Sequence, residues 1–176
     1  MRLFFAAFPD GESRQRIAAA TRALELKEIS IYQPPEQYHI TVVFIGGVSD
    51  SVVHEVREIG EAQRVECVSL RFDRWEYWDK ARAVVASSPD RPEPLLQLRA
   101  SLTAGLTRRG VAFDDKPLRP HITVARKFAQ APVLPNLSGF SCTLRAFSLI
   151  SSVTPPGGSV YTVVDSWPLL DIAARR

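Results

Sequence analysis

The chain has few residues of the types that usually mark disulfide frameworks and metal sites. Among its 176 residues there are two cysteines and three histidines. Cys67 and Cys142 form neither a Cys-x-x-Cys pair nor a zinc-binding pattern. We therefore expect two reduced thiols and no disulfide, which favours the cytoplasm as the compartment.

Long apolar runs are also missing. None approaches the length that spans a bilayer, so we expect no membrane contact. The apolar stretch near the N-terminus, Leu3–Phe8, is shorter than the hydrophobic region of an export signal and ends at Pro9. We predict that this stretch is a first buried strand.

Several familiar catalytic motifs are lacking as well. The sequence has no His-x-His, no His-Glu-x-x-His and no carboxylate pair beside the histidines that are discussed below. It also lacks a glycine-rich phosphate loop and the alternating three-histidine motif of the histidine-triad nucleotide hydrolases. We therefore expect neither a metal ion nor a cofactor.

The composition predicts a single domain over residues 1–176, and we expect a monomer. Hydrophobic residues make up 45% of the chain and charged residues 23%, which is enough apolar material for a core. The net charge is 22 − 19 = +3. Between Arg108 and Lys127, six basic residues against two acidic ones give a local excess of +4 around His121. Such an excess suits a phosphate-bearing substrate, but from charge alone a solvated loop is the better explanation.

Hydrophobic periodicity predicts strands that alternate with helices. Apolar stripes of helical spacing follow Asp10, follow Ser49 or Asp50, and run from about Glu93 to Arg109. Runs rich in β-branched and aromatic residues predict strands at Leu3–Phe8, His39–Ile45, Val68–Trp75, Arg82–Ser87, His121–Phe128, Cys142–Ser151 and Val160–Val164.

The order of these elements is repeated along the chain. The first strand is followed by a helix, a proline-containing loop and the tetrapeptide His39-Ile40-Thr41-Val42. The strand Arg82–Ser87 is followed by a helix, a proline-containing loop and His121-Ile122-Thr123-Val124. The two histidines are 121 − 39 = 82 residues apart, close to half the chain. The sequence therefore predicts a duplicated unit whose two lobes face each other across a cleft.

Two of the three histidines thus lie in identical tetrapeptides, which coincidence explains poorly. Residues i and i+2 of a strand project from the same face, so His39 shares a face with Thr41, and His121 with Thr123. A polar face on an otherwise buried strand is costly unless it lines a cleft or is fully paired. The opposite, apolar face is expected to carry Ile40, Val42, Phe44, Ile122 and Val124.

Other candidate residues are less specific. Strand parity places Arg126 off the histidine face, so it is equally a substrate-binding or a structural residue. Phe4 and Tyr161 are candidates to stack on a base, although core packing is the better explanation for Phe4. His54 lies opposite the apolar stripe of its helix and is expected to be solvated.

Two imidazoles and two hydroxyls suit one kind of reaction. An imidazole with a pKa near 6.5 serves as acid or base close to neutrality. Two of them on opposite sides of one phosphorus can run an in-line displacement, one accepting a proton from water and the other protonating the leaving oxygen. Thr41 and Thr123 would donate hydrogen bonds to the phosphoryl oxygens. The sequence thus predicts a metal-independent phosphodiesterase with a bell-shaped pH profile near neutrality, and its symmetry leaves the order of the two roles open.

The arrangement resembles the two-histidine phosphoesterase superfamily, and within it the bacterial and archaeal RNA 2′,3′-cyclic phosphodiesterases, also called 2′-5′ RNA ligases. The resemblance covers nearly the whole chain. It rests on Arg2–Ala6, Pro35–Gly46, Leu118–Arg126 and the segment from Phe147 to Tyr161.

The resemblance implies an α+β fold of two pseudo-symmetric lobes, each of mainly antiparallel sheet flanked by helices, with a central active-site cleft. It implies that RNA ends or nucleotides bearing a 2′,3′-cyclic phosphate are hydrolysed to the 2′-phosphate. It also implies weak, reversible joining of tRNA half-molecules through a 2′-5′ linkage. On this analogy His39 protonates the 3′ oxygen and His121 activates water.

Two alternatives stay open. The same chemistry would serve a small nucleotide such as ADP-ribose cyclic phosphate. A non-catalytic module of the same fold would bind RNA ends or nucleotides, although binding alone does not need two titrating imidazoles.

Overall fold

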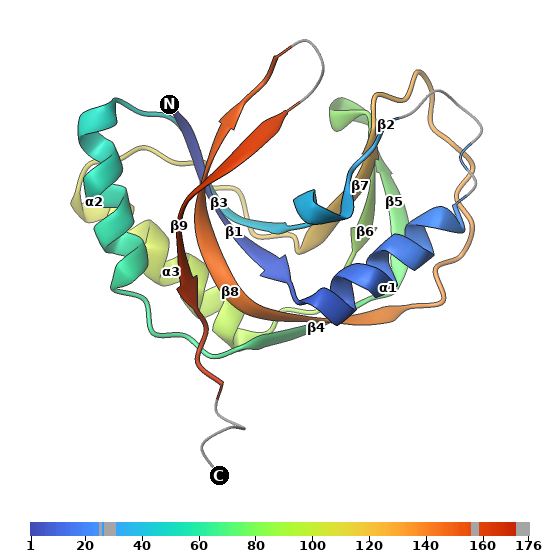
Figure 1. Cartoon of the computed structure of the whole chain (residues 1–176), viewed down its shortest axis with the longest axis horizontal. Coiled ribbons are helices and arrows are strands. Elements are labelled where there is room, and N and C mark those ends of the chain that lie inside the picture. Colours follow the sequence, from blue (N-terminus) through green and yellow to red (C-terminus); the bar gives the residue numbers. More distant parts are fainter. Residues whose placement is uncertain (25, 27–30, 156–158, 172–176) are drawn as a thin grey trace.

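The computed structural model describes residues 1–24, 26, 31–155 and 159–171. Within these residues the chain forms two antiparallel sheets and three α-helices, which confirms the predicted α+β class. Figure 1 shows one sheet on the left and the other on the right, with the helices around them.

The larger sheet has the strand order β3-β1-β8-β4, and β9 also pairs with β8. Strand β8 is the longest and pairs with three neighbours because β4 and β9 occupy successive lengths of one of its edges. Strand β3 lies at the edge of the sheet. The bounds are β1 Arg2–Pro9, β3 Ile40–Gly47, β4 Val68–Phe72, β8 Phe140–Val153 and β9 Val160–Pro168.

The smaller sheet has the strand order β2-β7-β6-β5. Its bounds are β2 Ile31–Tyr32, β5 Arg74–Trp78, β6 Ala83–Ser87 and β7 His121–Arg126. Strand β1 pairs antiparallel with β3, and β6 pairs antiparallel with β7. The predicted duplication is therefore present as two antiparallel strand pairs. In each pair a helix lies between the two strands in the sequence, and the second strand begins at the His-Ile-Thr-Val segment.

One predicted strand is in fact two. The run Val68–Trp75 divides at Asp73 into β4, which belongs to the larger sheet, and β5, which belongs to the smaller. The side chains that are buried change phase at this point: Phe72 is buried, and the next buried residue is Trp75. The chain therefore crosses from one sheet to the other here, and the short strand β2 was not predicted at all.

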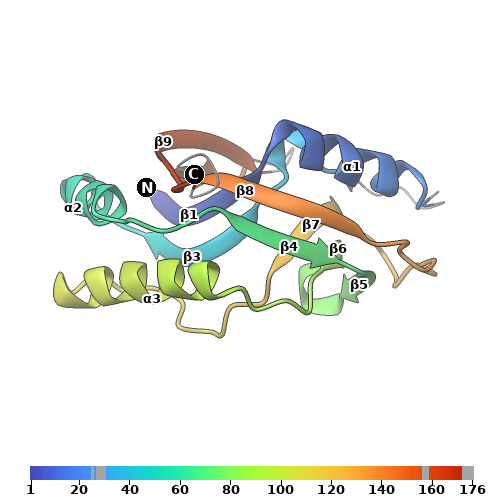
Figure 2. The same ribbon diagram turned by 90° about the horizontal axis from the view of Figure 1, so that it is seen from below.

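The helices agree with the periodicity. Asp10 caps α1, Gly11–Arg22, because its Oδ1 accepts a hydrogen bond from the Ser13 amide at 2.9 Å. Helix α2 spans Asp50–Glu61, and α3 spans Glu93–Arg108. Helix α1 lies at the opposite end of the molecule from α2, as both Figure 1 and Figure 2 show.

One apolar core joins the two sheets. The four leucines of the α3 stripe, Leu95, Leu98, Leu102 and Leu106, are fully buried. They belong to the same cluster as Phe5 of β1 and as side chains of β6 and β7. A shared core holds the two sheets in one arrangement, which the site described below requires.

Helices α2 and α3 pack closely at Gly105. A methyl group at this position would lie 2.7 Å from Cγ2 of Ile59, which is itself buried. We expect Gly105→Ala to lower the free energy of unfolding by about 1–2 kcal/mol, because overpacking outweighs the better helix propensity of alanine. Urea denaturation measures the change.

The matched control is Gly11→Ala at the first position of α1, where an added methyl group has no neighbour within 4 Å. This variant should be neutral or stabilised by about 0.5 kcal/mol. If Gly105→Ala and Gly11→Ala had the same free energy of unfolding, the result would contradict the close packing of α2 and α3 at Gly105.

Candidate active site

The two His-x-Thr motifs face one cleft. Strands β3 and β7 are neighbours although they belong to different sheets. A cavity of about 800 Å³ is lined by both Thr41 and His121, and an adjoining cavity of about 240 Å³ is lined by His39 and Thr41. Both predicted histidines therefore lie around two compartments that meet at Thr41, and Thr123 lies next to Arg126, which lines the smaller one.

The two histidines are held by the same backbone contact. Nδ1 of His39 lies 2.6 Å from the carbonyl oxygen of Gln37, and Nδ1 of His121 lies 2.6 Å from that of Arg119. A carbonyl oxygen only accepts, so Nδ1 of each ring must carry the proton and donate it. Each neutral imidazole therefore keeps its lone pair on Nε2.

Both strands contain a β-bulge directly after the threonine. Thr41 pairs with Ala6 and Val43 with Phe5, so Val42 is an extra residue. Thr123 pairs with Val85 and Ala125 with Val84, so Val124 is an extra residue in the same place. A bulge shifts the side-chain alternation by one residue. The burial pattern after each histidine is accordingly identical in the two strands.

The bulges overturn two expectations from strand parity. Phe44 and Arg126 each lie five positions after their histidine (44 − 39 and 126 − 121) and were placed on the opposite face. Phe44 in fact lines both compartments together with Thr41. Arg126 lines the smaller compartment, and its Nη2 donates to Oγ1 of Thr123 at 3.4 Å. The extra residue returns both side chains to the cleft face.

Backbone carbonyl groups along the free edge of β3 accept hydrogen bonds from Arg99 and from the segment that leads to His121. Nη1 of Arg99, from α3, donates to the carbonyl oxygen of the bulged Val42 at 2.7 Å, and its Nη2 donates to that of Lys116 at 2.6 Å. The amide of Asp114 donates to the carbonyl oxygen of Phe44 at 2.8 Å. Arg99 and residues 114–116 thus join the strand of the first motif to the approach of the second.

His39 is surrounded by aromatic rings. The ring centroids of Phe4, Tyr161 and Phe8 lie 5.3, 5.4 and 5.8 Å from that of the imidazole. Phe4 is only 3% exposed, which leaves little of its surface for a ligand. Tyr161 is half-buried, meets Phe4 edge to face and lines the smaller compartment.

His121 has different neighbours. The ring of Trp78 lies 4.2 Å from the imidazole, centroid to centroid. Nε1 of Trp78 donates to Oε2 of Glu76 at 2.8 Å, and the same oxygen pairs with Arg119 at 3.1 Å. The guanidinium of Arg119 in turn lies 5.0 Å above the Trp78 ring. These contacts fix a tryptophan against the second histidine.

Burial keeps both imidazoles neutral at pH 7. The pKa of His39 is lowered to about 4, chiefly by burial and in smaller part by the charges of His121 and Arg126, while the hydrogen bond to the Gln37 carbonyl acts in the opposite direction. Burial also lowers the pKa of His121, as do the cations Arg126 and Arg119. An anion in the cleft would stabilise both imidazolium forms and raise both pKa values.

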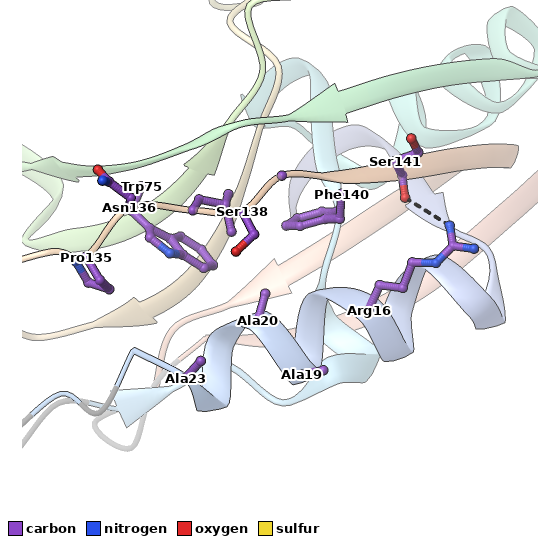
Figure 3. Close-up of a pocket in the computed structure, with 12 residues that line it drawn as sticks. Arg16, Ala19, Ala20, Ala23, Trp75, Pro135, Asn136, Ser138, Phe140 and Ser141 are labelled. Carbon is purple, nitrogen blue, oxygen red and sulfur yellow. Dashed lines mark hydrogen bonds between the residues drawn. The ribbon is translucent and has the colours of Figure 1, made fainter.

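Other parts of the described chain offer no comparable chemistry. A hollow of about 720 Å³ lies between α1 and residues 135–141 (Figure 3) and is lined largely by apolar side chains such as Trp75 and Phe140. His54 is exposed on α2, as expected, beside Glu58. Cys67 and Cys142 are free thiols. Across the described residues there is no cluster of three or more His, Cys, Asp or Glu side chains suited to a metal ion.

Sequence reasoning missed Trp78 and Arg99 and placed Phe44 on the wrong face of its strand. Trp78 and Arg99 are distant in sequence from the histidine motifs, and only tertiary packing brings them to the cleft. The position of Phe44 had a signal, because Thr41 is followed by two apolar residues that interrupt the alternation. In none of the helices that the structure describes is there an apolar span long enough to cross a membrane.

Known proteins are similar to this chain in both sequence and fold. A sequence model of the 2′-5′ RNA ligase superfamily matches residues 9–154. The chain is 31% identical to an RNA 2′,3′-cyclic phosphodiesterase of Thermus thermophilus, over 96% of this chain and 90% of the relative. It is 28% identical to one of Escherichia coli, over 96% of both. The crystal structure of E. coli LigT complexed with 3′-AMP is similar to this fold with a TM-score of 0.83 at 26% identity, covering 97% of this chain and 98% of that one.

The position of Arg126 is testable without a substrate. Because its charge lowers the pKa of both histidines, Arg126→Gln should raise the pKa of His39 above about 4 and should also raise that of His121. Titration of the imidazole Cε1 resonances by NMR measures both values. Arg64→Gln, which removes a charge from an exposed arginine after α2, should change neither. Unchanged histidine titrations in Arg126→Gln would contradict the placement of Arg126 in the cleft.

Proposed function

This chain belongs to the 2′-5′ RNA ligase superfamily, and from that premise we propose that it hydrolyses RNA or nucleoside 2′,3′-cyclic phosphates to the 2′-phosphate. The relatives described above are named RNA 2′,3′-cyclic phosphodiesterases. The observation that carries the proposal to this chain is the pair of mirrored imidazoles, each with Nδ1 bound to a backbone carbonyl and Nε2 left for proton transfer.

The proposed reaction is an in-line displacement at phosphorus. Nε2 of neutral His121 accepts a proton from a water molecule as the water oxygen bonds to phosphorus. The bond from phosphorus to the 3′ oxygen breaks on the opposite side, and Nε2–H of protonated His39 gives its proton to that oxygen. The products are a 2′-phosphate and a free 3′ hydroxyl. This order of roles follows the resemblance, since the two motifs have the same backbone geometry.

Three side chains would bind the phosphoryl group. The hydroxyls of Thr41 and Thr123 donate to its non-bridging oxygens, and Arg126, beside Thr123, supplies a positive charge for the transition state. Tyr161, half-buried in the smaller compartment, would contact a base. We assign buried Phe4 to the support of His39 and Tyr161.

We also propose that the chain acts as a monomer in the cytoplasm. This chain alone supplies the two imidazoles, the Thr41 hydroxyl and the Arg126 guanidinium that the proposed reaction uses. The two cysteines are unpaired, which suits a reducing compartment. Reverse joining of RNA ends through a 2′-5′ linkage would use the same groups, with a hydroxyl of RNA in the place of water.

The assignment predicts a graded set of losses. His39→Ala and His121→Ala should each lower kcat on adenosine 2′,3′-cyclic phosphate by roughly 10²-fold or more, because each removes one proton-transfer group. Thr41→Ala and Thr123→Ala should each lose about 1.5–3 kcal/mol of transition-state stabilisation, the value of a hydrogen bond to a charged group. Steady-state kinetics measures all four.

His54→Ala is the matched control, because His54 lies exposed on α2, where its Nε2 is 3.2 Å from Oε1 of Glu58. It should keep wild-type activity. A loss in His54→Ala equal to that in the other two variants would refute the pairing of His39 with His121.

The lowered pKa values change the expected pH dependence. The acid histidine must be protonated and the base neutral, so activity falls on both sides of an optimum. Because the pKa of His39 is about 4 and that of His121 is below its usual value, the optimum of kcat/KM, which reports the free protein, should lie below pH 6.5. The bound anion raises both values, so the optimum of kcat should lie at higher pH. Identical optima for kcat and kcat/KM would contradict this coupling.

A further inference from the structure

A row of side chains leads from His121 across the smaller sheet. His121 of β7 lies opposite Ser87 of β6, and Ser87 lies opposite Arg74 of β5. Residues that are directly opposite in antiparallel strands project from the same face of the sheet, with their Cβ atoms about 5 Å apart. Ser87 and Arg74 therefore extend the catalytic face outward from His121 to the edge strand β5.

This row ends in a small pocket. A cavity of about 160 Å³ is lined by Arg74, Arg91 and Arg119, together with Glu76 and Ser87. Arg119 also lines the 800 Å³ compartment beside His121. The small pocket is thus a direct neighbour of the active site, and one arginine faces both.

Ser87 has an unused hydroxyl in this pocket. The residue is only 6% exposed, and its Oγ forms no hydrogen bond to any of the described residues. Buried polar atoms are normally paired, and one that is not calls for a partner. The neighbouring Ser88 is already engaged, since its Oγ accepts from the Asp90 amide at 3.1 Å. Oγ of Ser87 is therefore a buried hydroxyl without a partner among the described residues, in a residue that lines a basic pocket.

The charge of the pocket suits one phosphodiester. Arg74 pairs with Asp73 at 2.9 Å and Arg119 with Glu76 at 3.1 Å, so three guanidinium groups stand against two carboxylates and leave one positive charge. Among the described residues Arg91 has no acidic partner, and its Nη1 donates only to the carbonyl oxygens of Pro89 and Asp90. Both ion pairs are at the surface and hold their guanidinium groups weakly, so unused N–H donors remain available.

We propose that Ser87, Arg74, Arg91 and Arg119 form a second phosphate site, which binds the internal phosphodiester on the 5′ side of the terminal nucleotide of an RNA substrate. This inference rests on the proposed function, because it assumes that the cyclic phosphate occupies the site between His39 and His121. The second site distinguishes an RNA end from a mononucleotide, which has no internal phosphodiester. RNA then leaves the cleft across β6 and β5, over the row of side chains that starts at His121.

The experiment compares three substrates. They are adenosine 2′,3′-cyclic phosphate, the adenylyl-adenosine dinucleotide ending in the same cyclic phosphate, and that dinucleotide with an uncharged methylphosphonate as its internal linkage. The double variant Arg74→Gln/Arg91→Gln should lower kcat/KM on the charged dinucleotide by about tenfold, as expected for lost charge-assisted hydrogen bonds. It should leave the mononucleotide within about twofold. The wild-type protein should have a kcat/KM about tenfold lower on the methylphosphonate dinucleotide than on the charged dinucleotide. On the methylphosphonate dinucleotide, the double variant should have nearly the same kcat/KM as the wild type.

Two further variants distinguish a specific phosphate-binding site from a general electrostatic attraction of RNA by positive charge. Ser87→Ala changes no charge and should still weaken the charged dinucleotide selectively. Arg64→Gln removes a charge from an exposed arginine that, like Arg91, donates to nearby carbonyl oxygens. Arg64 follows the C-terminus of α2, and α2 lies at the opposite side of the molecule from β5 (Figure 1). This variant should leave the preference for the dinucleotide unchanged.

Equal losses on mononucleotide and dinucleotide, no loss on the dinucleotide, or an equal loss in Arg64→Gln would each overturn the second site. Calorimetric binding of the dinucleotide 2′-phosphate provides a test that needs no turnover: equal affinity in the wild type and the double variant overturns the site. A wild-type protein that leaves adenosine 2′,3′-cyclic phosphate intact overturns the proposed function, and the binding comparison still decides the second site.

Discussion

The carbonyl oxygen of Val42, displaced from the regular ladder by the bulge in β3, accepts a hydrogen bond from Arg99 at 2.7 Å. Strand β3 is an edge strand, so its outward backbone groups have no neighbouring strand to pair with. Arg99 and the amide of Asp114 take that place, and the segment they belong to continues to His121. The hydrogen bonds that pair the free edge of β3 therefore also position the segment that carries His121. The cleft between the two His-x-Thr motifs depends on these contacts.

The two halves share a backbone plan but differ in their side chains. Each histidine donates Nδ1–H to the carbonyl two residues earlier, and each threonine precedes a bulge. The bulge then delivers an aromatic residue, Phe44, to one half and a cation, Arg126, to the other. Aromatic rings surround His39, whereas a tryptophan and a network of charged groups surround His121. A duplicated frame thus gives two imidazoles different surroundings, which an acid and a base require.

Much of this was readable from the sequence, because periodicity and repetition are local properties. The repeated His-Ile-Thr-Val segments identified both strands, and the leucine stripe of α3 identified its buried face. The bulges were not predicted, since a single inserted residue leaves only the faint signal of two successive apolar positions, Val42-Val43 and Val124-Ala125. The division at Asp73 was missed because both halves of that run favour a strand. Contacts such as Trp78 with His121 depend on tertiary packing, which no local pattern contains.

The central claim is that two histidines cleave a cyclic phosphodiester by proton transfer alone. Its most direct test is to incubate the wild-type protein with adenosine 2′,3′-cyclic phosphate in an excess of EDTA and to identify the product by phosphorus NMR. The account predicts that the cyclic resonance is replaced by that of adenosine 2′-phosphate alone, at the same rate with and without the chelator. Formation of the 3′-phosphate, or activity that EDTA abolishes and zinc or manganese restores, would contradict it.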